Sequence, residues 1–210
     1  YADLWVNKGL IALKRGQTDV AKDHFIKALR YNQEQAQAYN NLGYIYLKER
    51  SYGRAHDNFQ RALKVNPDYL EARYNLALTY FHMGKKEEAK KEYRTILAIA
   101  PDIADPHHDM GIICFEEQNY ECAVEHFQAA THLDPGYASA WQNLALALGE
   151  LGRFEEAVVA DRRCIDADPD NGECRNILAI HQRKAALVDP ALQQARDTRT
   201  AENTPASYFE

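Results

Sequence analysis

The sequence predicts an all-α fold: a solenoid of antiparallel helix pairs, built from about six units of 34 residues. Two series at a fixed interval support this prediction. Alanine recurs every 34 residues, at Ala21, Ala55, Ala89, Ala123 and Ala157. Glycine or alanine recurs at the same interval, at Gly9, Gly43, Ala77, Gly111, Ala145 and Ala179. A period of this length indicates stacked supersecondary units rather than one globular core.

Within each unit, apolar residues follow the spacing of two amphipathic helices. In the unit 36–69, Leu42, Ile45 and Tyr46 share one helical face, and Ala55 and Phe59 share a face of the next helix. The small residues let the two backbones approach. An aromatic residue fills the gap toward the following unit, at Phe25, Phe59, Tyr93 and Phe127. Proline ends the second helix because it lacks an amide donor, at Pro67, Pro101, Pro135 and Pro169.

The turn between the helices of a unit needs a residue with positive φ. Glycine supplies it at Gly16, Gly84 and Gly152, whereas Arg50 and Gln118 stand at the same position in the other two units. One hairpin cannot bury both its faces, so neighbouring units complete the core. The expected repeats are 2–35, 36–69, 70–103, 104–137 and 138–171, followed by a partial sixth unit or cap at 172–188.

The pattern weakens at the sixth unit. Asp161 stands where the other units carry the aromatic residue. Because an unpaired buried carboxylate is costly, we expect this interface to be rearranged, with Asp161 near its edge or paired to Arg162 or Arg163. A helix from about Glu173 to Leu187 should cap the solenoid with a polar outer face. We expect residues 189–210 to be a polar C-terminal tail, a short helix followed by a flexible segment.

These slots together form the pattern W-x2-L-G-x2-Y…A-x3-F…P. The clearest copy is Tyr39, Leu42, Gly43, Tyr46, Ala55, Phe59, Ala62 and Pro67. On these residues the chain resembles the tetratricopeptide repeat (TPR) family, over roughly residues 2–188. The resemblance implies a right-handed superhelical solenoid that serves as a protein–protein interaction module. It also implies that the first helix of each repeat lines a concave groove.

Composition limits the partners. The chain has 25 Lys and Arg against 31 Asp and Glu, a net charge of −6, which argues against a nucleic-acid partner. No apolar run approaches the ~18 residues of a membrane span. Because the chain opens at Tyr1 and not at methionine, we expect an upstream segment, and a secretion signal or lipid anchor there is left open.

The four cysteines form two symmetrical pairs. Cys114 and Cys122 flank the helix-to-helix turn at Gln118, and Cys164 and Cys174 flank the turn at Pro169. Positions equidistant from a turn lie opposite one another in antiparallel helices, so each pair can form a disulfide, which would place the protein in an oxidising compartment such as a periplasm. The alternative is four free thiols that act as small buried residues. Zinc is not expected because no C-x2-C spacing occurs.

Catalysis finds little support in the sequence. None of the eight histidines belongs to an H-E-x-x-H motif, and most should be isolated surface residues. The sequence also lacks a Gly-rich phosphate loop and a G-x-S-x-G motif. We therefore expect no enzyme activity, no cofactor and no metal.

The resemblance directs attention to the groove. The residue two before the Gly/Ala slot points into it in this family, and here these residues are Asn7, Asn41, Asn75, Asp109 and Asn143. Such a ladder offers donors and acceptors to an extended peptide backbone, or it ties neighbouring helices together. An apolar stripe runs beside the ladder: Leu10, Leu13, Tyr44, Leu47, Leu78, Phe81, Ile112 and Phe115. Either these residues face the groove, or adjoining helices cover about half of them.

One known specificity of the family does not fit. Members that bind the acidic tails of chaperones carry a clamp of Lys, Asn and Arg, for which Asn41 matches the central position. Val6, Leu10, Glu71 and Asn75 stand at the other clamp positions, and Glu71 would repel a carboxylate. We therefore do not expect a co-chaperone.

With six units, no catalytic domain, possible periplasmic disulfides and an apolar groove, the chain resembles the TPR lipoproteins, described as pilotins, that help an outer-membrane secretin oligomerise in type IV pilus assembly. The similarity is in architecture, size and compartment. We therefore expect a mostly monomeric assembly factor on the periplasmic face of the outer membrane. It would bind an apolar or extended segment of a partner such as a secretin-like subunit. The alternatives are a general scaffold or adaptor, cytoplasmic or part of a larger multidomain protein, and a scaffold that assembles head to tail.

Overall fold

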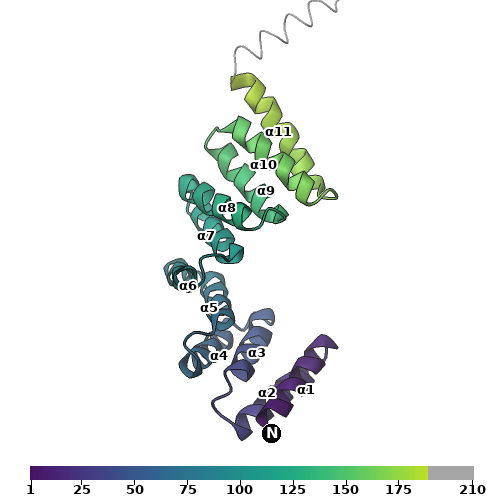
Figure 1. Cartoon of the computed structure of the whole chain (residues 1–210), viewed down its shortest axis with the longest axis vertical. Coiled ribbons are helices and arrows are strands. Elements are labelled where there is room, and N and C mark those ends of the chain that lie inside the picture. The colour runs from purple at the N-terminus through teal and green to yellow at the C-terminus, as the bar shows by residue number, and fades with distance from the viewer. Residues whose placement is uncertain (189–210) are drawn as a thin grey trace, which may run out of the picture. The chain divides into compact units, whose positions relative to one another are not determined.

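The computed structural model describes residues 1–188, so the prediction of a helix and flexible tail at 189–210 lies outside the described residues. The described part contains eleven α-helices and no strand, and consecutive helices form pairs (Figure 1). This confirms the predicted fold class. The helices are α1 (Ala2–Lys14), α2 (Thr18–Tyr31), α3 (Ala36–Lys48), α4 (Tyr52–Val65), α5 (Leu70–His82), α6 (Lys86–Ile99), α7 (Ala104–Glu116), α8 (Tyr120–Leu133), α9 (Ala138–Glu150), α10 (Phe154–Ala167) and α11 (Gly172–Val188).

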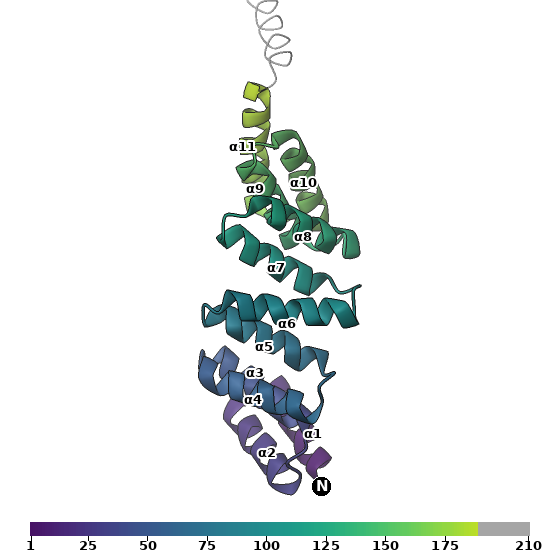
Figure 2. The same ribbon diagram turned by 90° about the vertical axis from the view of Figure 1, so that its left-hand side faces the viewer.

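The helices belong to two compact units, residues 1–102 and residues from 103 onward. The first unit holds the pairs α1–α2, α3–α4 and α5–α6, and the second holds α7–α8, α9–α10 and the single helix α11 (Figure 2). Within the described residues, no helix combines the length and the apolar character needed to cross a membrane.

Glycine and phenylalanine fix the approach of the helices within a pair. The rings of Phe25, Phe59 and Phe127 are buried, and each lies against the glycine of its own repeat, which is Gly9, Gly43 and Gly111 respectively. A Cβ added to Gly43 would lie 2.6 Å from Phe59 Cε1, closer than real Cβ contacts. Phe25 also shares one core cluster with Ala38 and Leu42 of the next repeat. The Phe25 ring therefore fills the space inside its own hairpin as well as the gap to the next repeat.

All five predicted turns contain a residue with positive φ. The φ angles are 71° at Gly16, 74° at Gly84 and 73° at Gly152. Arg50 and Gln118 adopt the same conformation, with φ of 58° and 60°, although they carry side chains. The turn geometry is therefore the same in every hairpin, whichever residue occupies it.

The expectation for Asp161 is wrong. Its side chain is fully buried and neither Arg162 nor Arg163 pairs with it; instead Asp161 Oδ2 lies 2.7 Å from Nδ1 of His181 on α11. His181 can reach this position because Gly149 leaves room, since a Cβ there would clash with the imidazole. Burial raises the pKa of the Asp161 carboxyl. Its other oxygen, Oδ1, has no hydrogen-bond partner among the described residues.

Two further expectations need correction. Most histidines are not isolated on the surface: His108 and His181 are buried, and only His82 and His132 are exposed. Each buried imidazole has a hydrogen-bonding partner on a neighbouring helix, which makes its burial tolerable. The expected polar outer face of α11 is present, since Arg175, Gln182, Arg183 and Lys184 are exposed, and the correction is that Ile180 and Leu187 are exposed as well.

Both predicted disulfides are present. Cys114 of α7 bonds to Cys122 of α8, with Cα atoms 5.8 Å apart, and Cys164 of α10 bonds to Cys174 of α11, with Cα atoms 6.2 Å apart. No cysteine is left free. Each disulfide therefore cross-links two successive helices of the second unit.

Candidate functional site

Two members of the amide ladder lie between helices. Asn75 of α5 is buried and donates its side-chain amide to Asn40 Oδ1 of α3 over 3.1 Å. Asn40 in turn donates to Glu71 Oε1 over 2.9 Å and lies 3.4 Å from the Tyr69 hydroxyl. Burial raises the pKa of Tyr69, which keeps the hydroxyl protonated. The amide of Asn75 is thus used in a contact between α3 and α5.

The same arrangement recurs two repeats later. His108 of α7 replaces Asn40, and its Nδ1 and Nε2 lie 3.3 Å from the Tyr137 hydroxyl and 3.1 Å from Asn143 Nδ2. Burial is again the main cause that raises the pKa of Tyr137. Asn143 therefore joins α7 to α9 within the second unit, as Asn75 joins α3 to α5 in the first.

The other three ladder residues differ in their accessibility. Asn7 is exposed, and Asn41 is half-buried and donates to the Gln37 carbonyl oxygen over 2.7 Å. Asp109 is half-buried, with Oδ1 at 3.4 Å from His108 Nδ1. Binding of a peptide by the ladder stays a prediction.

The predicted apolar stripe is mostly half-buried. Tyr44 is its most accessible member, with 40% of its surface exposed. Leu10 and Leu13 pack against the core of the first two helix pairs, and Ile112 and Phe115 pack against the core of the second unit. Leu47, Leu78 and Phe81 are also half-buried. A role for the stripe in binding likewise stays a prediction.

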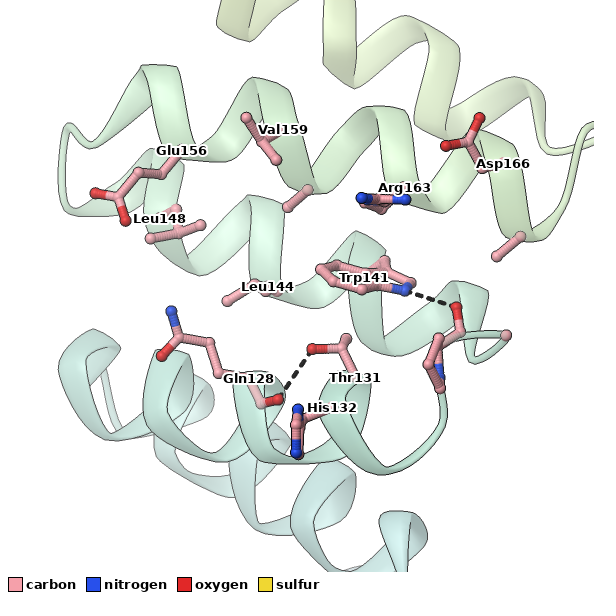
Figure 3. A pocket seen from close by; sticks show the side chains of 14 residues that line it. Gln128, Thr131, His132, Trp141, Leu144, Leu148, Glu156, Val159, Arg163 and Asp166 are labelled. Atoms are coloured by element: carbon pink, nitrogen blue, oxygen red, sulfur yellow. Dashed lines mark hydrogen bonds between the residues drawn. The ribbon is translucent and has the colours of Figure 1, made fainter.

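A cavity of about 970 Å³ lies elsewhere, among α8, α9 and α10 of the second unit. Figure 3 shows Trp141 and Leu144 of α9 between the side chains of α8 and those of α10. The lining residues are Gln128, Thr131, His132, Pro135, Gly136, Trp141, Leu144, Leu148, Glu156, Val159, Ala160, Arg163, Asp166 and Ala167. Val159 is 59% exposed at the rim although it is apolar.

The cavity is lined by a short side chain at a position where earlier repeats carry longer ones. In earlier repeats the position of Trp141 is occupied by Trp5, Tyr39, Arg73 and His107. Each of these residues has a counterpart nineteen residues later, on the second helix of its repeat: His24, Asn58, Glu92 and His126. Three of these pairs bridge their helices: the rings of Trp5 and His24 are 5.2 Å apart, Arg73 bonds Glu92 over 2.8 Å, and His107 Nδ1 lies 3.2 Å from His126 Nδ1. Opposite Trp141 stands Ala160, whose methyl group cannot span the same distance.

Trp141 is held in place. Its indole nitrogen donates to the Pro135 carbonyl oxygen over 2.9 Å, the dashed line beside Trp141 in Figure 3. Arg73 makes the equivalent bond to the Pro67 carbonyl oxygen over 2.7 Å in the first unit. A fixed indole with one face toward the cavity is a preformed apolar surface.

Charged and polar groups surround the opening. Glu156 pairs with Arg153 over 2.6 Å, and the hydrogen bond from Arg153 lowers the pKa of the Glu156 carboxyl. Arg163 and Asp166 are exposed at the rim, and neither forms an ion pair with another residue of 1–188. The Arg163 guanidinium is therefore available to a ligand carbonyl or carboxylate.

The first unit contains a smaller cavity at the equivalent place, of about 590 Å³, among α4, α5 and α6. Its lining is charged, with Asp57, Arg61 and Lys64 on α4 and the Arg73–Glu92 ion pair across it. The apolar lining around Trp141 therefore distinguishes the cavity of the second unit.

The sequence did not lead to this cavity, because the predicted binding residues all lie on the first helix of a repeat. One indication was available on the second helices: Ala160 is the small residue in a series that otherwise consists of His24, Asn58, Glu92 and His126. Only the structure shows that this series faces the Trp141 series across two helices.

Four family models match the chain, described as Tetratricopeptide repeat at residues 6–55, 46–110 and 138–171 and as TPR repeat at residues 111–152. Together they extend over residues 6–171, well beyond half of the chain. The chain belongs to the tetratricopeptide repeat family. TPR proteins act as protein-interaction modules, and their fold is a non-catalytic scaffold.

Solved structures of TPR proteins share the fold at low identity. YrrB, a TPR protein with an unusual peptide-binding site, is 23% identical with a TM-score of 0.68, and the match covers 88% of this chain and 92% of YrrB. MamA from Desulfovibrio magneticus is 20% identical with a TM-score of 0.72, covering 82% and 97%. A thermophilic TPR protein of Thermus thermophilus is 20% identical with a TM-score of 0.65, covering 87% and 99%. No curated protein matches the chain.

Proposed function

We propose that this TPR chain is an adaptor that binds a peptide segment of a partner protein, and that the cavity around Trp141 receives an apolar side chain of that peptide. The observation that carries the proposal is an apolar cavity of about 970 Å³ at a position where other repeats bridge their helices. Its size is that of a site that takes an organic ligand group, ~300–1,000 Å³.

The lining suits one large side chain flanked by peptide backbone. Trp141, Leu144 and Val159 offer apolar surface on α9 and α10, and Trp141 loses little freedom on binding because it is already hydrogen-bonded. At the rim, Gln128 and Arg163 carry donors for peptide carbonyl oxygens. The peptide-binding site of YrrB, a protein of similar fold, supports this class of ligand.

The test is a selection of peptides on the immobilised full chain, followed by affinity measurements on variants. Val159→Glu places a charge at the apolar rim, and Val20→Glu on α2 is the matched control, since Val20 is also an exposed valine, at 45%. Both substitutions are at the surface and should change stability by less than about 0.5 kcal/mol. We expect Val159→Glu to weaken binding at least tenfold and Val20→Glu to leave it unchanged.

Fluorescence locates the bound peptide. The chain has two tryptophans, so Trp5→Phe leaves Trp141 as the sole tryptophan, and its emission should shift when a peptide enters the cavity. Equal affinity in Val159→Glu and wild type, with a loss in Tyr44→Ala, would move the site to the apolar stripe and contradict the proposal.

A second candidate function is favoured by the two disulfides. We propose that the chain works in an oxidising compartment as an assembly factor on the periplasmic face of the outer membrane, where the peptide would come from a secretin-like subunit. Four cysteines paired across two helix hairpins support such a compartment, because disulfides are rare in reducing ones. A general adaptor remains consistent with the same fold.

Thiol titration of the denatured, unreduced protein tests the compartment. We expect no reactive thiol in protein purified from its native cells, whereas four free thiols would contradict an oxidising location. Loss of secretin multimers in a deletion strain would support the assembly role, and normal multimers would exclude it.

A further inference from the structure

A histidine, His126, lies beside the disulfide between Cys114 and Cys122. His126 follows Cys122 by four residues on α8, so the two side chains share a helical face. A ring nitrogen of His126 and the sulfurs of Cys114 and Cys122 all lie within 4.8 Å of one another. Cys114 is buried, and the other two residues are half-buried. Within residues 1–188, no other group of His, Cys, Asp or Glu has this geometry.

A second histidine orients the first. His107 Nδ1 of α7 lies 3.2 Å from His126 Nδ1, so one ring donates a proton and the other accepts it. If His126 is the donor, the lone pair of His126 is on Nε2. Histidines that bind metals commonly have this arrangement, with one nitrogen at the metal and the other N–H held by a fixed acceptor.

We propose that the reduced chain binds Zn²⁺ through the thiolates of Cys114 and Cys122 and the imidazole of His126, with water as the fourth ligand. A dithiol reductant opens the disulfide: it gives up two electrons and two protons and becomes a disulfide itself. The two cysteine thiols then release their two protons as they bind the ion. Exchange with an oxidised dithiol reverses the reaction and releases Zn²⁺, because sulfurs bonded to each other are no longer thiolates.

The backbone already suits such a site. Zn–S bonds of about 2.3 Å place two thiolates of a tetrahedral site about 3.8 Å apart. The Cα atoms of Cys114 and Cys122 are 5.8 Å apart, so rotation of the side chains can supply this separation without moving α7 or α8. His107 then acts as a positioning residue that does not touch the ion.

The second disulfide provides an internal control. Cys164 and Cys174 also link two successive helices, yet no third ligand completes a metal-binding group beside them within the described residues. Reduction should therefore create two dithiols in one protein, of which only one binds the ion in a tetrahedral site.

The experiment titrates the full chain with Co²⁺, which reports tetrahedral thiolate ligation by its charge-transfer and d–d absorption, and then displaces it with Zn²⁺. The protein is measured oxidised and after reduction with a phosphine, without oxygen. We expect one Co²⁺ per reduced chain and none per oxidised chain. Cys114→Ser and His126→Ala should lose the tetrahedral spectrum, and His107→Ala should weaken affinity about 10- to 100-fold.

Two controls should keep the spectrum: the double variant Cys164→Ser/Cys174→Ser, and His82→Ala, which removes an exposed histidine of the first unit. Circular dichroism confirms that each variant is helical, and His126→Ala tests the site even if Cys114→Ser unfolds. The proposal is overturned if reduced wild type shows no thiolate charge-transfer band, or if the band survives Cys114→Ser. Equal loss of the band in Cys164→Ser/Cys174→Ser would also overturn it.

Discussion

Asp161 and His181 place a polar pair where the other repeats bury an aromatic ring. Taking a carboxylate out of water is costly, and here a single hydrogen bond of 2.7 Å to the His181 imidazole offsets part of that cost. The unpartnered oxygen Asp161 Oδ1 shows that the compensation is incomplete. The pair therefore joins α10 to α11 by a specific contact, with less apolar burial than Phe59 or Phe127 supplies.

Removing the imidazole should leave the carboxylate buried without its partner. We expect His181→Ala to lower the free energy of unfolding by about 3–5 kcal/mol, and Asp161→Asn to cost less because an amide can still form a hydrogen bond with the His181 imidazole. Urea unfolding measures both, with His82→Ala as the exposed control. If His181→Ala costs no more than that control, the pair does not stabilise the α10–α11 contact.

At the scale of helix pairs, each hairpin depends on one residue in the left-handed region. Side chains are disfavoured there by about 1–2 kcal/mol, whereas glycine is not. Gly84 has open space around the position of an added Cβ, so any cost of substitution there comes from the backbone alone. Arg50 and Gln118 accept this cost in the second and fourth hairpins.

Glycine at these two positions should therefore stabilise the fold. We expect Arg50→Gly and Gln118→Gly each to raise the free energy of unfolding by about 0.5 kcal/mol, since the relief of strain exceeds the entropy that glycine adds to the unfolded chain. Gly84→Ala should lower it by about 1 kcal/mol. Thermal unfolding of the three variants checks the signs, and a loss of stability in Arg50→Gly would contradict the argument.

Features that depend on residues close together in the sequence could be predicted. They include the helix pairs, the positive φ at Gly16 and Arg50, and the pairing of Cys114 with Cys122 across a turn. The partner of Asp161 lies twenty residues away, and its position depends on the space that Gly149 leaves. The cavity at Trp141 depends on what α9 and α10 leave unfilled, which no pattern within one helix reveals.

For the whole molecule, the cross-links are unevenly distributed. Both disulfides lie in the unit that begins at residue 103, and the unit 1–102 contains none. In stacked repeats, stability is approximately a sum over units and their nearest neighbours. The two units should therefore respond differently to the same change in redox conditions.

Reduction should destabilise the second unit selectively. The disulfides close loops of 8 and 10 residues, and the chain-entropy model assigns each about 2.5 kcal/mol through the unfolded state. Hydrogen exchange followed by mass spectrometry, with and without a reductant that does not bind metal, measures this directly. We expect faster exchange in α7–α11 and little change in α1–α6. Cys164→Ser/Cys174→Ser should reproduce the part of the effect that belongs to α10 and α11, because that loop alone is then open. An equal increase in both units would mean that the disulfides stabilise the chain as one cooperative body, contrary to this prediction.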